Sequence, residues 1–383
     1  MKDLNQELQQ RKANHLYRSR RVSDSQQQPE MIIDGRQVLC FCSNDYLGLA
    51  NHPDVKAAFI KGIETYGAGS GAAHLINGHS RAHHALEEEL ADFSGYPRAL
   101  LFSTGYMANL AIAQSLLERG DTVLEDRLNH ASLLDGGLLS GARLMRYAHN
   151  DAIDLARKLA SRESGEKLVL TDGVFSMDGD IADLPEIAKV CTEQDAWFMV
   201  DDAHGIGVLG SQGKGSLEHY RLSSTDIPVY MATLGKALGT AGAFIAGSDD
   251  LIETLIQKAR SYIYTTASPP AVAEATRASL NIIQSQPELR SQLNDNIRYF
   301  RSSCKQLGIA LTHSNTAIQP VILGETEKTV AASEQLFAQA ILVTAIRPPT
   351  VAEGTARLRI TLSAQHSHAH IDKLIEALGK LQQ

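Results

Sequence analysis

Short apolar runs alternate with longer segments of helical periodicity through the middle of the chain. The runs are ALLF (99–102), TVLE (122–125), RLMRY (143–147), KLVLTD (167–172), WFMVDD (197–202), PVYMAT (228–233) and GAFIAG (242–247). This alternation is typical of an α/β fold in which helices cover a mostly parallel sheet. Ligands bind at the carboxyl ends of the strands in such sheets, and polar residues follow several of these runs.

The C-terminal quarter of the chain has a different pattern. We expect strands at IQPVIL (318–323), ILVTAI (341–346) and ARLRITL (356–362), and a helix at TVAASEQLFAQA (329–340). In a last helix, Ile371, Leu374, Ile375 and Leu378 have the i, i+3, i+4, i+7 spacing of one apolar stripe. The pattern predicts a smaller α+β domain over residues 286–383.

The remaining residues are assigned to an N-terminal arm and a large domain. Residues 1–45 are expected to form an arm that packs with the small domain, and residues 46–285 the large domain. Leu4, Leu8 and Leu16 fall near helical spacing among polar and basic residues, which predicts an amphipathic helix at the start of the arm.

Composition and charge exclude two classes of protein. The 383 residues are 43% apolar, enough to bury a core without disulfides or metal ions, so a small stapled scaffold is excluded. The formal net charge of −8 is unsuited to a protein whose affinity comes from phosphate-backbone contacts. The first ten residues, MKDLNQELQQ, lack the apolar segment of a signal peptide, so we expect a cytoplasmic protein.

Cysteine and histidine spacing gives no metal ligand set. Cys40, Cys42, Cys191 and Cys304 are sparse and are expected to be buried small side chains in a reducing compartment. Of the closely spaced His366, His368 and His370, only the first and last share a helical face. We expect this stretch to be a solvated segment.

Lys236 has the most distinctive surroundings of the candidate residues. It lies in TLGKALGTAG, between the apolar runs 228–233 and 242–247. Most lysines are simply exposed. Small neighbours, however, allow a planar ligand to approach closely, and a lysine held in such a site becomes nucleophilic enough to form a Schiff base.

Asp201 and Asp202 follow the apolar strand WFMV and precede His204. A carboxylate at the end of a buried strand needs a partner, which can be a segment that it caps, a metal ion or the protonated ring nitrogen of a cofactor. The glycines and alanines that crowd this position, without a third suitably spaced carboxylate, disfavour the metal. A ring nitrogen is the favoured partner.

Two further motifs lie at expected helix starts. In STGYMAN (103–109) a strand turns into a helix whose free N–H groups are suited to phosphate. The motif is neither G-x-G-x-x-G nor a P-loop, which disfavours dinucleotide and nucleotide phosphates. His130, in NHAS, is either a helix cap or a ring that stacks on a flat cofactor, and the sequence leaves both open.

Together these motifs resemble the α-oxoamine synthases, a family of fold-type I pyridoxal-phosphate enzymes. The resemblance runs from SNDYLGLANHP (43–53) through MVDDAHGIGVLG (199–210) and ATLGKALGTAGAF (232–244) to TAIRPPTVAEGTARLRITLSA (344–364). One departure is His74, where many relatives carry Arg or Gly. The resemblance implies a seven-stranded, mostly parallel sheet in the large domain, a smaller α+β domain, and a homodimer with shared sites.

The resemblance also implies the roles of residues around the cofactor. Lys236 would hold pyridoxal phosphate as a covalent Schiff base and later move a proton, while Asp201 would pair with the ring nitrogen. The remaining expected cofactor contacts are His130 on the ring face, His204 and Ser176 at its phenolic edge, and Gly105, Tyr106 and Thr233 near the phosphate. Either Thr265 or Thr266 would reach the phosphate of the neighbouring chain.

Substrate contacts follow from the same resemblance. Arg359 matches the position that binds the amino-acid carboxylate, a role suited to a bidentate guanidinium. Arg18 and Thr350 match positions that contact the acyl substrate, Arg347 is a weaker candidate, and His130 is also expected beside the substrate.

The activity implied is the decarboxylative condensation of L-alanine with a pimeloyl thioester, which gives 8-amino-7-oxononanoate for biotin formation, CO2 and the free thiol. The acyl carrier is either coenzyme A or acyl carrier protein. Glycine-using relatives such as 2-amino-3-ketobutyrate CoA ligase and 5-aminolevulinate synthase share the cofactor residues and remain alternatives. A more remote alternative is a non-enzymatic regulator that binds pyridoxal phosphate; steady CO2 release would exclude it.

Overall fold

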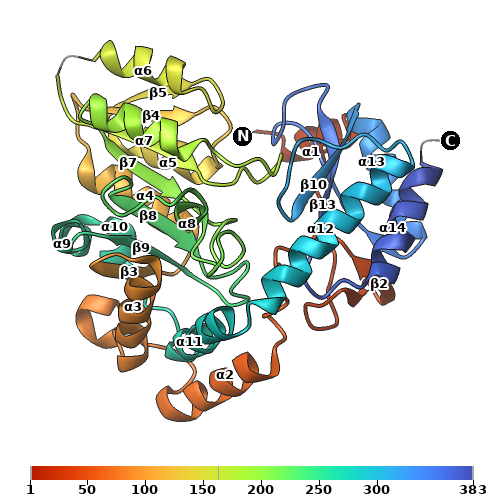
Figure 1. The fold of residues 1–383 in the computed structure, drawn as a ribbon, viewed down its shortest axis with the longest axis horizontal. Coiled ribbons are helices and arrows are strands. Elements are labelled where there is room, and N and C mark those ends of the chain that lie inside the picture. Colours follow the sequence, from red (N-terminus) through yellow and green to blue (C-terminus); the bar gives the residue numbers. More distant parts are fainter. Residues whose placement is uncertain (1, 163, 382–383) are drawn as a thin grey trace. The chain divides into compact units, whose positions relative to one another are not determined.

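The structure, a computed structural model, describes residues 2–162 and 164–381. The described chain divides into two compact units (Figure 1). The smaller unit combines residues 1–48, 176–180 and 289–383, and the larger unit combines residues 49–175 and 181–288. The sequence places the divisions after residues 45 and 285, and it does not separate 176–180 from the large domain.

A seven-stranded sheet forms the centre of the larger unit, and this confirms the predicted fold class. Its strands are β3 (Arg98–Phe102), β4 (Thr122–Asp126), β5 (Arg143–Tyr147), β6 (Lys167–Asp172), β7 (Trp197–Asp201), β8 (Val229–Thr233) and β9 (Ala243–Gly247). Their order is β3-β9-β8-β7-β6-β4-β5. Strand β9 runs antiparallel to both of its neighbours, β3 and β8, and the other neighbouring pairs are parallel. The seven apolar runs of the sequence correspond to these seven strands because a sheet covered on both faces needs continuous apolar strands.

Helices connect the strands of the larger unit. They are α2 (Pro53–Tyr66), α3 (Arg81–Ser94), α4 (Gly105–Leu116), α5 (Ala131–Ser140), α6 (Ala152–Ala160), α7 (Leu184–Glu193), α8 (Ser216–Tyr220), α9 (Asp249–Lys258), α10 (Arg260–Ile263) and α11 (Pro270–Ser285), with a π-helical turn η1 (His74–Gly78). Gly136 lets α5 approach α4 closely, since a Cβ there would lie 2.9 Å from the carbonyl oxygen of Asn109. This close approach positions the first turns of both helices at the carboxyl edge of the sheet.

The smaller unit brings together the two ends of the chain, drawn in red and blue in Figure 1. One of its sheets has the order β1-β2-β11 and the other β10-β13-β12. The strands are β1 (Glu30–Ile33), β2 (Arg36–Cys40), β10 (Ile318–Gly324), β11 (Ile341–Leu342), β12 (Thr344–Ile346) and β13 (Ala356–Thr361). The helices are α1 (Leu4–Ala13), α12 (Glu288–Gln306), α13 (Thr326–Ala338) and α14 (His368–Lys380). Ile371, Leu374, Ile375 and Leu378 are buried, as the apolar stripe of α14 predicts.

Three expectations for the smaller unit are wrong in detail. The expected strand 341–346 is two short strands in different sheets. The N-terminal helix ends before Leu16 and buries none of its side chains, so Leu4 and Leu8 do not form a packed stripe. His366 is not solvated, because its ring stacks on Phe41 and its Nε2 lies 2.9 Å from the carbonyl oxygen of Cys40.

The four cysteines are free thiols, and Cys40, Cys191 and Cys304 are buried as expected, whereas Cys42 is half-buried. Among the described residues, no helix has both the length and the apolar character needed to cross a membrane.

Glu125, on β4, makes the stability of the folded chain depend on pH. Its side chain is buried, neither carboxyl oxygen has a hydrogen-bond partner in the described chain, and burial raises its pKa to about 7. A carboxyl group whose pKa is higher in the folded than in the unfolded chain stabilises the folded chain in acid. This stabilisation by Glu125 is lost as the pH rises through about 7.

We therefore expect Glu125→Gln, which does not titrate, to be more stable than the parent by up to about 3 kcal/mol at pH 8.5, with little difference at pH 4.5. Urea denaturation at both pH values measures this. The control is Glu193→Gln, because Glu193 is exposed. An equal effect of Glu125→Gln at both pH values would contradict the raised pKa of Glu125.

Candidate active site

Asp201 is a buried carboxylate at the carboxyl end of β7. It is 5% exposed, and its Oδ2 accepts a hydrogen bond of 2.7 Å from the Asn109 side-chain amide. Its Oδ1 accepts a bond of 3.0 Å from the backbone N–H of Ala203. Both donors are uncharged, and a buried carboxylate is costly without a cationic partner. The position is therefore suited to a ligand that brings a protonated nitrogen.

A chain of hydrogen bonds connects Asp201 with His130. Asn109, on α4, donates to Ser132 Oγ at 2.8 Å, and Ser132 Oγ lies 2.7 Å from His130 Nδ1. His130 is the N-cap of α5, and its backbone N–H donates to Asp172 at the end of β6. The Nδ1 atom also accepts the backbone N–H of Ser132, so the proton of the neutral ring is on Nε2. Burial lowers the pKa of His130 against the opposing effect of Asp201. The hydrogen bonds thereby fix the orientation of the ring, as a stacking surface requires.

Lys236 lies in the turn between β8 and β9, with its Nζ 2.9 Å from His204 Nε2. The turn is rigid at both ends. Thr233 donates from Oγ1 to the carbonyl oxygen of Gly242 at 3.0 Å. Gly239 has a φ of +68°, and a Cβ there would lie 2.3 Å from the backbone nitrogen of Ala50. The amine of Lys236 is thus presented from a fixed backbone beside an imidazole.

The N-terminus of α4 lies after β3, at the same edge of the sheet. Thr104 is the N-cap, and its hydroxyl accepts from the N–H of Met107 at 3.2 Å. The preceding N–H groups, of Gly105 and Tyr106, have no intrahelical acceptor and are suited to an anion. A Cβ at Gly105 would be in ordinary van der Waals contact with the side chains of Met231, Ala243 and Thr233, the nearest of these atoms at 3.7 Å. The Tyr106 hydroxyl donates to Asp135 of α5.

Arg359 is a buried cation of the smaller unit. It is 7% exposed, on β13, and its Nε donates to the carbonyl oxygen of Ser176 at 2.6 Å. Its two terminal nitrogens each lie 3.2 Å from Asn44 Oδ1, and one of them also donates to Thr361 Oγ1. All of these acceptors are neutral. The charge of the guanidinium is therefore not compensated by them, which suits it to a carboxylate ligand.

Arg18 and Thr350 are far apart in the sequence and meet in the smaller unit. Arg18 Nη2 donates to Thr350 Oγ1 at 3.3 Å. Arg347 donates to the carbonyl oxygen of Tyr17, and its pKa is lowered by burial and secondarily by Arg18. Two neighbouring guanidinium groups repel each other, so this group is suited to an anionic ligand.

The predicted site residues thus form two groups, one in each unit. Gly105, Tyr106, His130, Asp201, His204, Thr233 and Lys236 belong to the larger unit, and Arg18, Ser176, Thr350 and Arg359 belong to the smaller unit. Their roles toward a ligand remain predictions.

Sequence reasoning missed four residues that hold these groups in place. Asn109 and Ser132 orient Asp201 and His130, Asp172 holds the backbone of His130, and Asn44 faces Arg359. A signal existed for Asp172, which ends the apolar run KLVLTD as Asp201 ends WFMVD. The others lie within the quoted motifs and had no separate signal.

Asp202 has a structural role, which is one of the alternatives that the sequence leaves open for Asp201 and Asp202. It is fully buried and accepts from the N–H and hydroxyl of Ser216, at the start of α8, and from the Tyr230 hydroxyl. Burial raises its pKa to about 7 against these hydrogen bonds.

Comparisons with known proteins identify similar chains. Residues 36–378 match the family model described as aminotransferase class I and II. The 8-amino-7-oxononanoate synthase of Thioalkalivibrio sulfidiphilus is 62% identical over 381 residues, which are 99% of this chain and 97% of that protein.

Solved structures are similar as well. The 8-amino-7-oxononanoate synthase of Francisella tularensis is 33% identical, with a TM-score of 0.78 over 90% of this chain and 97% of that chain. A structure of SPT with a PLP internal aldimine is 32% identical, with a TM-score of 0.91 over 94% of this chain and 92% of that chain.

Proposed function

Because the chain belongs to the class I and II aminotransferase family, we propose that it is a pyridoxal-phosphate-dependent acyltransferase that condenses L-alanine with a pimeloyl thioester. The products are 8-amino-7-oxononanoate, CO2 and the free thiol. The observation that carries the cofactor part of the proposal is the buried Asp201 carboxylate, held by uncharged donors, at the same sheet edge as Lys236. The similarity to 8-amino-7-oxononanoate synthases supports the choice of substrates.

The groups of the larger unit fit pyridoxal phosphate. Lys236 is suited to bind its aldehyde carbon, Asp201 its pyridine nitrogen, and the N–H groups of Gly105 and Tyr106 its phosphate. Thr233 adds a hydroxyl near the phosphate and His130 a flat ring surface. When bound, the cofactor withdraws electrons from the Cα atom of the amino acid through its protonated ring.

The chain's own residues then handle protons and charge. Asp201 holds the proton on the ring nitrogen, because its buried carboxylate is stabilised by a cation. Lys236 would take the α-proton of alanine and would return a proton after the carboxyl group has left as CO2. His204, 2.9 Å from the lysine nitrogen, orients that amine and shares its proton.

Substrate recognition is assigned to the arginines of the smaller unit. Arg359 binds the carboxylate of alanine, and Ser176 contacts the phenolic edge of the cofactor. Arg18 and Thr350, joined by a hydrogen bond, contact the acyl substrate, with Arg347 beside them. These cations attract anionic substrates locally, although the formal net charge of the chain is −8.

Arg359→Lys is expected to weaken the binding of alanine by about 10- to 100-fold, because an ammonium group cannot bind a carboxylate through two parallel N–H groups. The dissociation constant is measured by titrating the cofactor spectrum with L-alanine. Arg357→Lys is the matched control, since Arg357 is an equally buried neighbour on β13 that is ion-paired with Asp178. Equal losses in both variants would contradict the assignment of Arg359.

A substrate panel tests the proposed activity. Alanine and glycine are each combined with pimeloyl, acetyl and succinyl thioesters, and the pimeloyl group is supplied on coenzyme A and on acyl carrier protein. We expect alanine with a pimeloyl thioester to have the highest kcat/KM. Preference for glycine would identify the chain as a glycine-using α-oxoamine synthase. Equal CO2 release with alanine and with glycine would exclude both assignments.

We also propose a homodimer in which each chain contributes to the neighbouring cofactor site through Thr265 or Thr266. Separate substitution of the two threonines by alanine, followed by measurement of cofactor affinity, identifies which of them contacts the phosphate. Loss of affinity in neither variant would contradict this contribution.

A further inference from the structure

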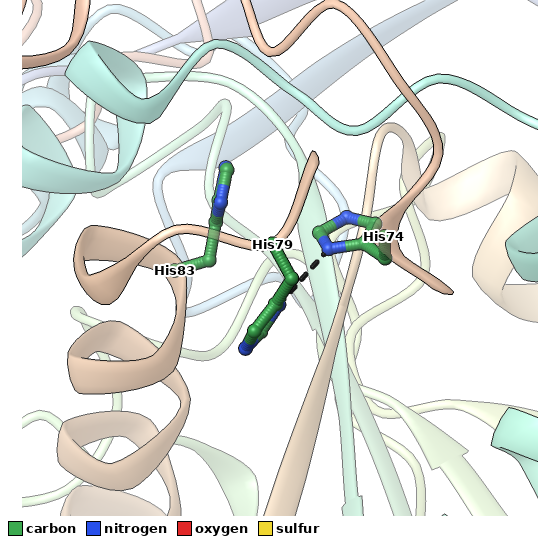
Figure 2. A group of neighbouring side chains, drawn as sticks. All are labelled: His74, His79 and His83. Atoms are coloured by element: carbon green, nitrogen blue, oxygen red, sulfur yellow. Dashed lines mark hydrogen bonds between the residues drawn. The ribbon is translucent and has the colours of Figure 1, made fainter. Parts of the chain in front are cut away.

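A group of histidines lies outside the proposed catalytic groups, where η1 leads into α3. His74 begins η1, His79 follows it, and His83 and His84 lie in the first turn of α3. Glu87, one turn further along α3, completes the group. Figure 2 shows three of these rings, with the hydrogen bond between His74 and His79.

His83 is excluded as a metal ligand by its own hydrogen bonds. Its Nε2 lies 2.8 Å from the carbonyl oxygen of Ser268, which requires a proton on Nε2. Its Nδ1 accepts the backbone N–H of Ser80 at 3.1 Å and so completes the capping box of α3. Both ring nitrogens are therefore used for structure, although the ring packs beside His74 and His79, with ring centroids 5.1 Å and 5.9 Å away.

We propose that His79 Nε2, His84 Nδ1 and Glu87 Oε2 form a binding site for Zn²⁺. His79 Nε2 lies 3.4 Å from His84 Nδ1 and 3.8 Å from Glu87 Oε2, and the three ligand atoms all lie within 4.8 Å of one another. Tetrahedral zinc with bonds of about 2.0–2.1 Å places its ligands about 3.3–3.4 Å apart. Two of the three separations are thus within about 0.5 Å of this spacing and the third is at most 4.8 Å, so small side-chain rotations bring the atoms to three corners of such a site and leave the fourth for water.

The other polar atoms of these side chains have separate partners that orient them. His79 Nδ1 lies 3.1 Å from His74 Nδ1, so the His79 N–H can donate there and leave Nε2 deprotonated for the metal. His74 itself is buried and stacks on Tyr262, with ring centroids 5.0 Å apart. Glu87 accepts the N–H of Leu101 at 3.0 Å through Oε1 and keeps Oε2 toward His79. A histidine ligand supported through its second nitrogen is the usual arrangement in zinc sites.

The site is accessible, and its donor set selects the ion. A cavity of about 450 Å³ is lined by His74, His79, His84 and Glu87, and half of the His84 side chain is exposed. Two imidazoles and one carboxylate suit zinc, whereas calcium and magnesium prefer oxygen ligands alone. A bound ion would link the segment after η1 to two successive turns of α3 and would stabilise the folded chain by mass action.

The test measures zinc on the cofactor-loaded enzyme after dialysis against Zn²⁺ without chelators. We expect one zinc per chain, removed by a chelator without loss of the cofactor spectrum. His84→Ala and Glu87→Gln should each weaken zinc binding at least about tenfold, since each removes one of three ligands. His313→Ala, which removes an exposed histidine of the smaller unit, should bind zinc as the parent does.

X-ray absorption at the zinc edge identifies the ligands independently. Nitrogen and oxygen neighbours at about 2.0–2.2 Å support the site, and a sulfur neighbour at about 2.3 Å would assign the metal to cysteine instead and overturn the proposal. Absence of stoichiometric zinc in the folded parent, or unchanged affinity in both His84→Ala and Glu87→Gln, would also overturn it. These outcomes do not depend on catalytic activity, so they are separable from the proposed function.

Discussion

Lys236→Ala is expected to abolish the visible absorption band of lysine-bound pyridoxal phosphate and to lower kcat by about 10³-fold or more. The change removes the only amine that the β8–β9 turn presents beside His204 in the described chain. It removes the covalent attachment and also the group that moves the α-proton, and loss of a general base alone lowers rates by about 10²- to 10⁴-fold.

Absorption spectroscopy of the purified variant measures the first effect, and borohydride reduction followed by peptide mapping gives a second readout. In the parent, reduction should leave the cofactor attached to Lys236. Lys258→Ala, an exposed lysine at the end of α9, serves as the control and should keep the band. A band of parental intensity in Lys236→Ala, or a reduced cofactor on another lysine, would contradict the assignment.

Asp201→Asn is expected to lower kcat by about 10²- to 10³-fold, the range found when one preorganised electrostatic group is removed. The amide has nearly the shape of the carboxylate but no charge, so it does not hold a proton on the pyridine nitrogen. Its NH2 group would also face the NH2 group of Asn109, whose Oδ1 is buried without a partner in the described chain.

Asp202→Asn provides a matched control one residue away. Asp202 accepts hydrogen bonds from Ser216 and Tyr230 in the protein core, so its substitution should lower the free energy of unfolding while the cofactor spectrum is kept. Asp201→Asn should change the spectrum and its dependence on pH with a smaller change in stability. The reverse pattern would show that the two carboxylates have been assigned the wrong roles.

The large sheet was predictable because most of its strands contain a continuous apolar run; the edge strand β5 (RLMRY) is the exception, with Arg143 and Arg146 exposed. Strands β4 and β9 are buried along their whole length, and such strands leave a sequence signal that does not depend on distant partners. The strand ends also place Asp201 and Lys236 at one edge of the sheet, which is why the candidate chemistry could be read from the chain.

The smaller unit was less predictable because its sheets join distant segments. The hairpin β1–β2 is extended by β11, about 300 residues later in the chain, so neither partner shows a complete pattern alone. His366 is buried because it faces Cys40 and Phe41, and no feature of the HSHAH stretch encodes that contact. The segment 176–180 joins this unit through contacts such as Arg357 with Asp178.

The same distinction applies to the sites. A lysine among glycines and a carboxylate after a strand are local signals, whereas the Asn109–Ser132–His130 connection exists only after α4 and α5 have packed. The histidine site near α3 depends on the turn that folds His79 back over His84 and Glu87, so spacing alone did not indicate it.

The central claim, condensation of alanine with loss of its carboxyl carbon, is tested most directly by isotope labelling. L-alanine labelled with ¹³C in its carboxyl group is incubated with the enzyme and a pimeloyl thioester, and CO2 and product are analysed by mass spectrometry. We expect labelled CO2 in equal amount to the released thiol, together with unlabelled 8-amino-7-oxononanoate. Label retained in the product, or no product from alanine on either acyl carrier, would contradict it.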